Sequence, residues 1–255
     1  LNVAPLWIQS KHAQKLQLHM NGTFGGHYST SCLQCHTTGF DTNPSAVNGG
    51  FDDAAAAINY DLNQIPALVA DAANRHVDNF PQLPKTLQNM ASIQCESCHG
   101  PGSNHPSHLG DSDHAIAGAT LDTAQCAQCH DSASGNQQGF YQWSASTHPL
   151  TASLAEGSVA TNASCVKCHT GEGFIEVRVK GQTATAHPDG HGITCAVCHD
   201  PHYSPNAHQL RLVGDFTLDS GDTCHNAGLG GRGKRCHNAR VSNPDATAAT
   251  RARGA

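Results

Sequence analysis

The stretch Cys95-Glu96-Ser97-Cys98-His99 places two thiols three residues apart and an imidazole directly after the second thiol. The same spacing occurs in four other places, at residues 32–36, 126–130, 165–169 and 195–199. Zinc sites, redox dithiols and haem attachment all use Cys-x-x-Cys, but a histidine directly after every copy is typical of c-type haem attachment. The residues of the five copies are Cys32, Cys35, His36, Cys95, Cys98, His99, Cys126, Cys129, His130, Cys165, Cys168, His169, Cys195, Cys198 and His199.

This spacing has a chemical reason. The two thiols add to the two vinyl groups on one edge of a porphyrin, and the adjacent histidine ligates the iron. Zinc binding would not require a histidine directly after the second cysteine in every copy, and a disulfide framework would not repeat the two-residue gap five times. The sequence therefore predicts covalently attached haem c at all five motifs.

The last two of the 12 cysteines, Cys224 and Cys236, are separated by eleven residues, and His237 follows the second one. Glycines at several places between the thiols would let this segment loop out while both thiols reach one porphyrin. We therefore expect a sixth haem with an expanded attachment motif, which would use every cysteine in the chain. The alternatives are a haem held by Cys236 alone or a structural disulfide. His225 is interpreted as a loop residue.

The composition agrees with a fold organised around cofactors. Only 38% of the 255 residues are hydrophobic and 5% are aromatic, while 25 glycines and 12 prolines favour turns and irregular backbone. Six haems would amount to one per about 42 residues, so we expect the porphyrins to replace the hydrophobic core. The predicted fold is a multihaem cytochrome c fold, mostly irregular, with short α-helices and little β-structure.

Charge and hydropathy narrow the range of partners. A formal net charge of −6 argues against nucleic acid, which requires clustered lysine and arginine. No apolar run approaches the roughly 20 residues that a transmembrane segment requires. Leu1 is not followed by a charged region and an apolar region typical of a signal peptide, so we expect a processed, exported chain located in the periplasm or outside the cell.

An internal repeat divides the chain. Residues 93–99 align with residues 193–199 at an offset of 100, and a Trp-x4-His element occurs at both Trp7–His12 and Trp143–His148. Each half therefore consists of Trp-x4-His followed by three haem motifs. We expect a duplicated three-haem unit, with the first unit at 1–136 and the second at 137–255.

The two halves differ in two segments. The first half has about 33 extra residues between Cys32 and Cys95, and residues 53–76 within them predict one or two helices interrupted at Pro66. In the second half, residues 174–179 alternate apolar and polar side chains, and Lys180-Gly181 can form a turn before residues 182–186. This pattern predicts one β-hairpin near 174–186.

The sequence contains enough histidines to supply a second ligand for each predicted haem iron. Of 19 histidines, 13 remain after the six motif histidines, and a second imidazole on each haem would leave no open position for a substrate. This surplus favours electron transfer over catalysis. The histidines nominated as distal ligands are His12, His27, His105, His148, His191 and His202. Their competitors are His76, His108, His187 and His208, and for any one of them the alternative is an ordinary surface histidine.

Three segments resemble the cytochrome c554 family of multihaem cytochromes: Trp7 to Ala13, Cys32 to Gly39, and Gln94 to Ser103. The resemblance covers residues 5–110 and returns more weakly over 126–240. It implies closely packed haem pairs, mainly bis-histidine ligation and a location outside the cytoplasm. The chain departs from the family because no haem motif precedes Trp7 and because the Cys224 and Cys236 spacing is unusual.

These departures suggest a head-to-tail homopolymer, in which the terminal haem of one chain meets the start of the next; His12, His19 or His27 would then ligate a neighbour's haem. Such a contact does not close on itself and makes a filament, resembling the extracellular cytochrome filaments of metal-respiring microbes.

We expect electron transfer between redox partner proteins and an external acceptor. The alternatives are a haem enzyme acting on a small nitrogen or sulfur compound, and a purely structural haem protein. An enzyme of this kind commonly has lysine in place of a motif histidine, and this chain does not.

Overall fold

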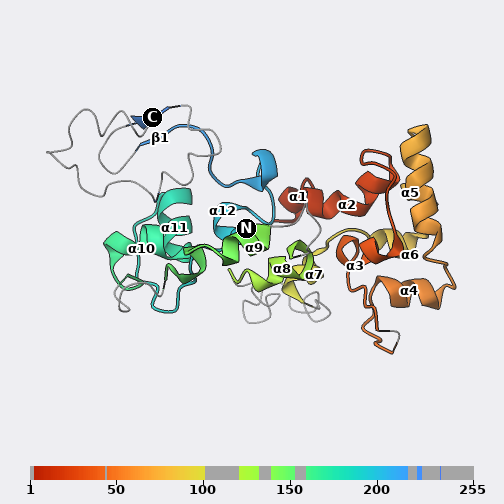
Figure 1. Cartoon of the computed structure of the whole chain (residues 1–255), viewed down its shortest axis with the longest axis horizontal. Helices are drawn as coiled ribbons and strands as arrows, with labels where there is room; N and C mark the ends of the chain where they lie inside the picture. Colours follow the sequence, from red (N-terminus) through yellow and green to blue (C-terminus); the bar gives the residue numbers. More distant parts are fainter. Residues whose placement is uncertain are drawn as a thin grey trace. The chain divides into compact units, whose positions relative to one another are not determined.

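The computed structural model describes residues 3–43, 45–100, 121–131, 139–152, 159–217, 223–225 and 236. Within these residues the helices are short, and the longest are α5 (Gln64–Arg75) with 12 residues and α2 (Lys11–Met20) with 10. Two strands of two residues each, β1 (Phe216–Thr217) and β2 (Thr223–Cys224), pair antiparallel. The prediction of a mostly irregular chain with short helices and little β-structure is confirmed (Figure 1).

The chain forms two compact units. Unit 1 consists of Leu1–Gln138 together with Pro201–Tyr203, and unit 2 consists of Gly139–Asp200 and Ser204–Ala255. The three-haem units expected at 1–136 and 137–255 stay a prediction. The remaining helices of unit 1 are α1 (Ala4–Trp7), η1 (Thr30–Cys32), α3 (Leu33–His36), α4 (Phe51–Ala57), η2 (Phe80–Gln82), α6 (Lys85–Asn89), α7 (Cys95–His99) and α8 (Ala124–His130). Those of unit 2 are α9 (Gly139–Ser144), η5 (His148–Leu150), α10 (Ala163–His169), α11 (Gly171–Phe174), η6 (Ile175–Val179), α12 (Cys195–Cys198) and η7 (Ala207–Gln209).

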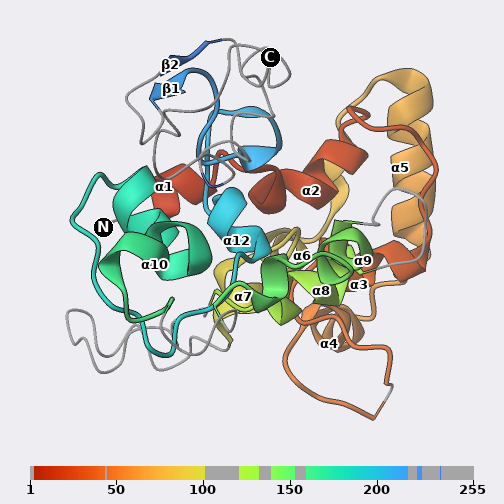
Figure 2. The same cartoon turned by 60° about the vertical axis from the view of Figure 1, so that its left-hand side comes forward.

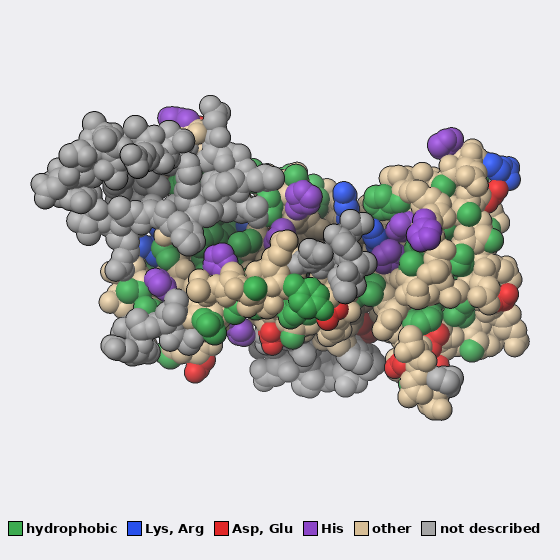
Figure 3. Space-filling model, in the orientation of Figure 1, with side chains coloured by type: hydrophobic (Ala, Val, Ile, Leu, Met, Phe, Trp, Pro, Cys, Tyr) green, Lys and Arg blue, Asp and Glu red, His purple; other side chains and the backbone are tan. Residues whose placement is uncertain are grey.

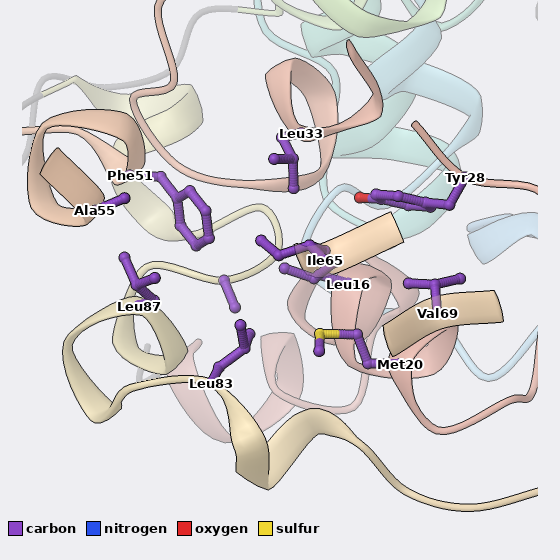
Figure 4. Close-up of a cluster of buried hydrophobic side chains, with 11 residues drawn as sticks. Leu16, Met20, Tyr28, Leu33, Phe51, Ala55, Ile65, Val69, Leu83 and Leu87 are labelled. Atoms are coloured by element: carbon purple, nitrogen blue, oxygen red, sulfur yellow. The ribbon is translucent and has the colours of Figure 1, made fainter. Parts of the chain in front are cut away.

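Unit 1 contains a hydrophobic core of amino-acid side chains. Helix α2 lies against α5, and α4 lies against α6. Their buried side chains point toward one another (Figure 4) and comprise Leu16, Met20, Tyr28, Leu33, Phe51, Ala55, Ile65, Val69, Leu83, Leu87 and Ala91. The expectation that haems replace the hydrophobic core is therefore wrong for this part of unit 1, because the extra residues of the first half bring their own apolar side chains.

The extra segment forms two helices, and the break between them lies before the predicted one. Helix α4 ends at Ala57 and α5 begins at Gln64, with Asn59 in the left-handed backbone region between them (φ 54°). Pro66 lies in the first turn of α5, where a missing backbone N–H leaves no helical hydrogen bond unmade. The prediction that Pro66 interrupts the helix is wrong for this reason.

The turn before α4 depends on two glycines in close contact. A Cβ atom on Gly50 would lie 1.9 Å from the carbonyl oxygen of Gly39, so no larger residue fits without moving the backbone. The approach lets Phe51 N–H donate to the carbonyl of Thr38 at 3.0 Å. This contact fixes the start of α4 beside the segment that follows the first haem motif.

The predicted hairpin at 174–186 is wrong, because residues 175–179 form a turn of π-helix that continues α11. Thr170 caps α11 through its hydroxyl oxygen, which accepts from Gly173 N–H at 3.1 Å. The chain does return toward this helix, but the carboxylate of Glu176 accepts the Thr185 N–H at 2.8 Å in place of a strand partner. Alternating β-branched residues fit a short helix as well as a strand, and the threonine cap decides for the helix.

In unit 2, α10 and α11 lie side by side, and α12 contacts α11. Figure 2 shows the two strands β1 and β2 of this unit next to each other. Within the residues that the structure describes, no helix is long and apolar enough to cross a membrane.

Candidate haem-attachment sites

All five Cys-x-x-Cys-His motifs lie in short helical segments: α3 with η1, α7, α8, α10 and α12. Residues at i, i+3 and i+4 share one face of a helix, so in α7, α8 and α10 the two thiols and the imidazole of the motif face the same side. Cys32 lies in η1 just before α3, and His199 directly follows α12 with extended backbone. On the opposite side an apolar residue between the cysteines is buried in three motifs: Leu33, Val166 and Val197. In these three motifs the buried residue anchors the helical segment in the protein, and the thiols are left to face a porphyrin edge.

The thiols agree with this use. None of the eleven cysteines whose side chains the structure describes forms a disulfide. Ten of these cysteines are half-buried, and Cys95 is exposed. The disulfide alternative for Cys224 lies outside this observation, because the side chain of Cys224 is not among those described.

In unit 1 the second cysteines of three motifs lie close together. The thiol of Cys129 forms a hydrogen bond with that of Cys35, and Cys98 lies near enough to interact electrostatically. Burial, together with the neighbouring Cys35 and Cys98, raises the pKa of Cys129 to about 12. The three attachment helices α3, α7 and α8 therefore meet at their second cysteines.

Unit 2 has the same arrangement. Cys168 and Cys236 form a hydrogen bond, and Cys198 lies near Cys236. The hydrogen bond from Cys236 lowers the pKa of Cys168 to about 6, with a further contribution from Arg178. The same bond, with burial, raises the pKa of Cys236. Cys236 thus contacts Cys168 and Cys198 in the way that Cys129 contacts Cys35 and Cys98 in unit 1.

Two motif histidines of unit 1 face a second histidine. The ring centres of His12 and His130 are 6.2 Å apart, with planes at 72°, and those of His99 and His202 are 6.1 Å apart, with planes at 10°. A ring nitrogen lies about 2.0 Å from a metal that it ligates and about 1.2 Å from its own ring centre, so two imidazoles on opposite sides of one metal have centres about 6.4 Å apart. The observed separations fit one iron between each pair.

The elements that position these rings come from distant parts of the chain. His12 lies in the first turn of α2, where burial and then the charge of His130 lower its pKa and favour the neutral imidazole that ligates metals. His202 lies in the segment Pro201–Tyr203, which belongs to unit 1 although the flanking residues belong to unit 2. Both residues are among the predicted distal ligands.

A third pair is His19 with His36; His19 was not among the predicted distal ligands and was named only as a possible ligand of a neighbouring chain's haem. Their ring centres are 5.1 Å apart with planes at 25°. His19 follows His12 by seven residues on α2, and this spacing places both on one helical face. The seven-residue spacing from His12 is the sequence signal that could have identified His19 as a candidate ligand. The repeat could not, because the equivalent position in the second half, residue 155, is alanine.

In unit 2 the carboxylate of Glu172 holds His191. It accepts from the backbone N–H of His191 at 2.9 Å and lies 2.7 Å from the ring nitrogen Nδ1. A carboxylate on one ring nitrogen leaves the other, Nε2, to face a metal, and this arrangement is common for metal-ligating histidines. In the competitor His187 it is Nε2 that contacts a carboxylate, that of Glu176 at 3.2 Å, which makes His191 the better candidate of the two.

Two motif histidines also have their Nδ1 atoms occupied. The Nδ1 atom of His199 donates to the carbonyl oxygen of His208 at 2.7 Å, and that of His36 lies 3.2 Å from the hydroxyl of Tyr28. On His36 this contact leaves Nε2 for an iron. His148, the second Trp-x4-His histidine, is half-buried, with Nδ1 at 3.3 Å from the Ser146 hydroxyl.

The other nominated histidines lie at the surface or outside the described residues. His27, His76 and His208 are exposed. His225 is also exposed and contacts the carboxylate of Asp215 at 2.8 Å. His105, His108 and the motif histidine His237 lie outside the described residues. Figure 3 shows histidine side chains at several places on one face of the molecule.

The two halves share local hydrogen bonds around their first motifs. The hydroxyl of Thr37 donates to the Leu33 carbonyl at 2.7 Å, and the hydroxyl of Thr170 donates to the Val166 carbonyl at 3.1 Å. Each threonine directly follows a motif histidine and is buried. The bond fixes the chain direction as it leaves the attachment helix.

A second shared hydrogen bond ties the Trp-x4-His elements to the next motif. Ile93 N–H donates to the carbonyl of His12, and Ile193 N–H donates to the carbonyl of His148, both at 3.0 Å. Ile93 and Ile193 are the residues that the repeat aligns at an offset of 100. The aligned sequence elements therefore make the same backbone contact within each unit.

Comparisons with known proteins point to polyhaem c-type cytochromes. Over 146 residues, which are 56% of this chain, it is 30% identical to the C-type polyheme cytochrome OmcB of two Geobacter sulfurreducens strains. The aligned part spans 16% of the length of those relatives. No family model and no solved structure matches the chain. The chain is thus distantly homologous to a part of a polyhaem c-type cytochrome.

Proposed function

We propose that this chain is a multihaem c-type cytochrome that transfers electrons through about six covalently attached haems. The observation that carries the proposal is that five short helical segments each carry two thiols three residues apart with an imidazole directly after the second, while motif imidazoles of unit 1 face a second imidazole at 6.1 Å and 6.2 Å. The distant homology to a polyhaem cytochrome agrees with it. When bound, haem supplies one-electron exchange at its iron.

The residues of the chain have two tasks in this function. The paired thiols hold each porphyrin at a fixed place relative to its helix. The motif histidine and a second histidine would both ligate the iron, which would keep substrates from it and favour electron transfer. In unit 1 the second histidines are His12 for the motif ending at His130 and His202 for the motif ending at His99.

In unit 2 the second ligands that we propose are His148 and His191. The Glu172 carboxylate on Nδ1 of His191 fixes the ring and leaves Nε2 for the iron. His148 is supported by the backbone contact that it shares with His12, since both carbonyls accept from the isoleucine before the next motif. His27 and His105 stay predictions from the sequence.

The sixth attachment site is supported by Cys236. Its contacts with Cys168 and Cys198 parallel those of Cys129 in unit 1, where Cys129 is the second thiol of the third motif. We infer that Cys236 has the same role, with Cys224 as the first thiol and His237 as the motif histidine.

Haem counting tests this proposal. The native, haem-loaded protein should show by intact mass six covalently bound haems, and its ferric electron paramagnetic resonance spectrum should contain only low-spin signals. A Cys236→Ala variant should be impaired at one haem, whereas His225→Ala, next to Cys224 and interpreted as a loop residue, should keep six. Absence of covalent haem in the native protein would refute the proposal. A high-spin ferric signal in it would favour the alternative, an enzyme acting on a small nitrogen or sulfur compound.

We further propose an exported location, with redox partner proteins or external acceptors as partners and a head-to-tail homopolymer as the assembly. The resemblance to extracytoplasmic multihaem cytochromes supports the location. Leu6 and Ile8, which are 44% and 59% exposed, offer apolar surface at α1 for contact with another chain. Negative-stain electron microscopy of the native protein tests the assembly: regular filaments are expected, and a monodisperse monomer with six internally ligated haems would contradict it.

A further inference from the structure

Helix α2 presents two histidines to two different attachment motifs of unit 1. His12 and His19 are seven residues apart, which is about two helical turns, so their side chains lie on one face. The ring of His12 faces His130, and the ring of His19 faces His36 at 5.1 Å between ring centres. One helix thus places one imidazole opposite the motif histidine of each of two haems.

The ring of His19 has no hydrogen-bonding partner. Both of its nitrogen atoms are buried, and neither has a partner among the described residues. Its neighbours are the aromatic rings of Phe24 at 4.9 Å and Tyr28 at 5.0 Å, apart from His36 itself. Buried polar groups in native proteins are nearly always satisfied, and an imidazole whose two nitrogens are both orphaned indicates a missing ligand.

The ring of His36 is held by a neighbouring hydroxyl group. On His36 the Tyr28 hydroxyl lies at Nδ1, which leaves Nε2 for the iron.

The distance between the rings needs a small adjustment. Two imidazoles that share one metal have ring centres about 6.4 Å apart, so His19 and His36 would separate by about 1 Å to admit an iron. The neighbouring α2 residues Leu16 and Met20 are fully buried in the core of unit 1 and hold the helix in place.

We infer that His19, and not His27, is the distal ligand of the haem attached at Cys32, Cys35 and His36. This inference rests on the proposed function, since it assigns a ligand within one of the proposed haem sites. His27 was the sequence-based choice because it lies just before the motif, but its side chain is exposed. With His19 included, all three motif histidines of unit 1 have a partner: His36 with His19, His99 with His202, and His130 with His12.

Substitution of the two competing histidines tests the assignment. His19→Ala should convert one haem of the six from low spin to high spin in the ferric protein and let the ferrous protein bind one equivalent of carbon monoxide. Added imidazole should restore the low-spin signal. His27→Ala should leave all six haems low-spin. Carbon monoxide binding in His27→Ala alone, or in neither variant, would overturn the assignment.

A conservative variant covers the case in which His19→Ala fails to fold or loses haem. His19→Met keeps an axial ligand, and methionine in place of histidine raises the reduction potential of a haem. We expect six low-spin haems with one potential raised; unchanged potentials would overturn the inference. Failure of the proposed function is a separate result, because it would appear as absence of covalent haem in the native protein, before any substitution.

Discussion

Substitution of Phe51 by alanine measures how much of unit 1 depends on its protein core. Phe51 is fully buried at the start of α4 and points into the cluster that also contains Leu33 and Leu87 (Figure 4). Burying a phenylalanine side chain contributes about 1.5–3 kcal/mol, and the cavity left by alanine adds to the loss. We therefore expect Phe51→Ala to destabilise unit 1 by about 3–5 kcal/mol.

The assay must report on the helices around this core rather than on the haems. Hydrogen exchange of the haem-loaded protein, resolved by peptide mass spectrometry, gives the free energy of opening for α4, α5 and α6 separately. Ile58→Ala is the matched control, because Ile58 directly follows α4 and is 41% exposed. We expect the control to change the opening free energy by less than about 0.5 kcal/mol. Intact mass should show six haems in both variants.

Equal protection in the two variants would refute the reasoning. It would mean that haem attachment alone holds α4–α6 in place and that the buried cluster of unit 1 contributes little. A loss of protection confined to the Phe51 variant, with the haem count unchanged, would show that this unit has a protein core beside its haem sites.

Three further predictions concern single contacts. Gly50→Ala should destabilise unit 1 by at least about 1–3 kcal/mol in the same exchange assay, because its Cβ would strike the Gly39 carbonyl, whereas Gly25→Ala, with nothing within 4 Å, should be close to neutral. Thr170→Ala removes the cap of α11 and should lower its opening free energy by about 0.5–2 kcal/mol; unchanged exchange in α11 would contradict the capping role. Glu172→Gln removes the negative charge beside the ring of His191 and should raise the reduction potential of one haem. The expected rise is about 60 mV for each 1.4 kcal/mol by which the ferric form is less stabilised, measured by spectroelectrochemical titration. Unchanged reduction potentials would contradict ligation by His191.

Some of the secondary structure could be predicted from the sequence, because it depends on residues that are adjacent in the chain. The general character of the chain, with short helices and little strand, follows from its composition and its many glycines and prolines. Two helices in the extra segment of the first half were also predictable, but their boundary was not. A proline inside a helical pattern predicts a break, yet Pro66 lies in the first turn of α5, where it costs no hydrogen bond. The hairpin at 174–186 failed because alternation of apolar residues is compatible with both strand and helix in so short a segment.

The core of unit 1 was missed for a different reason. A low overall hydrophobic fraction suggested that the haems would replace it, but an average over the whole chain does not show where apolar residues gather. Ile65, Val69 and Ala72 lie on one face of α5 at helical spacing, and they are buried together. A local search for this periodicity would have found the core.

The sequence by itself determined the spacing of the five Cys-x-x-Cys-His motifs, from which we predict the attachment chemistry, because two thiols and an imidazole at i, i+3 and i+4 need only one helical turn to face the same side. It also determined the internal repeat, which needs no structure to be seen. Only the tertiary structure decided which histidine faces which motif. His12 with His130, His99 with His202 and His19 with His36 pair across different elements, and packing of α2 and of the segment Pro201–Tyr203 brings them together. Such pairings depend on contacts between residues far apart in the chain, and local sequence spacing does not predict them.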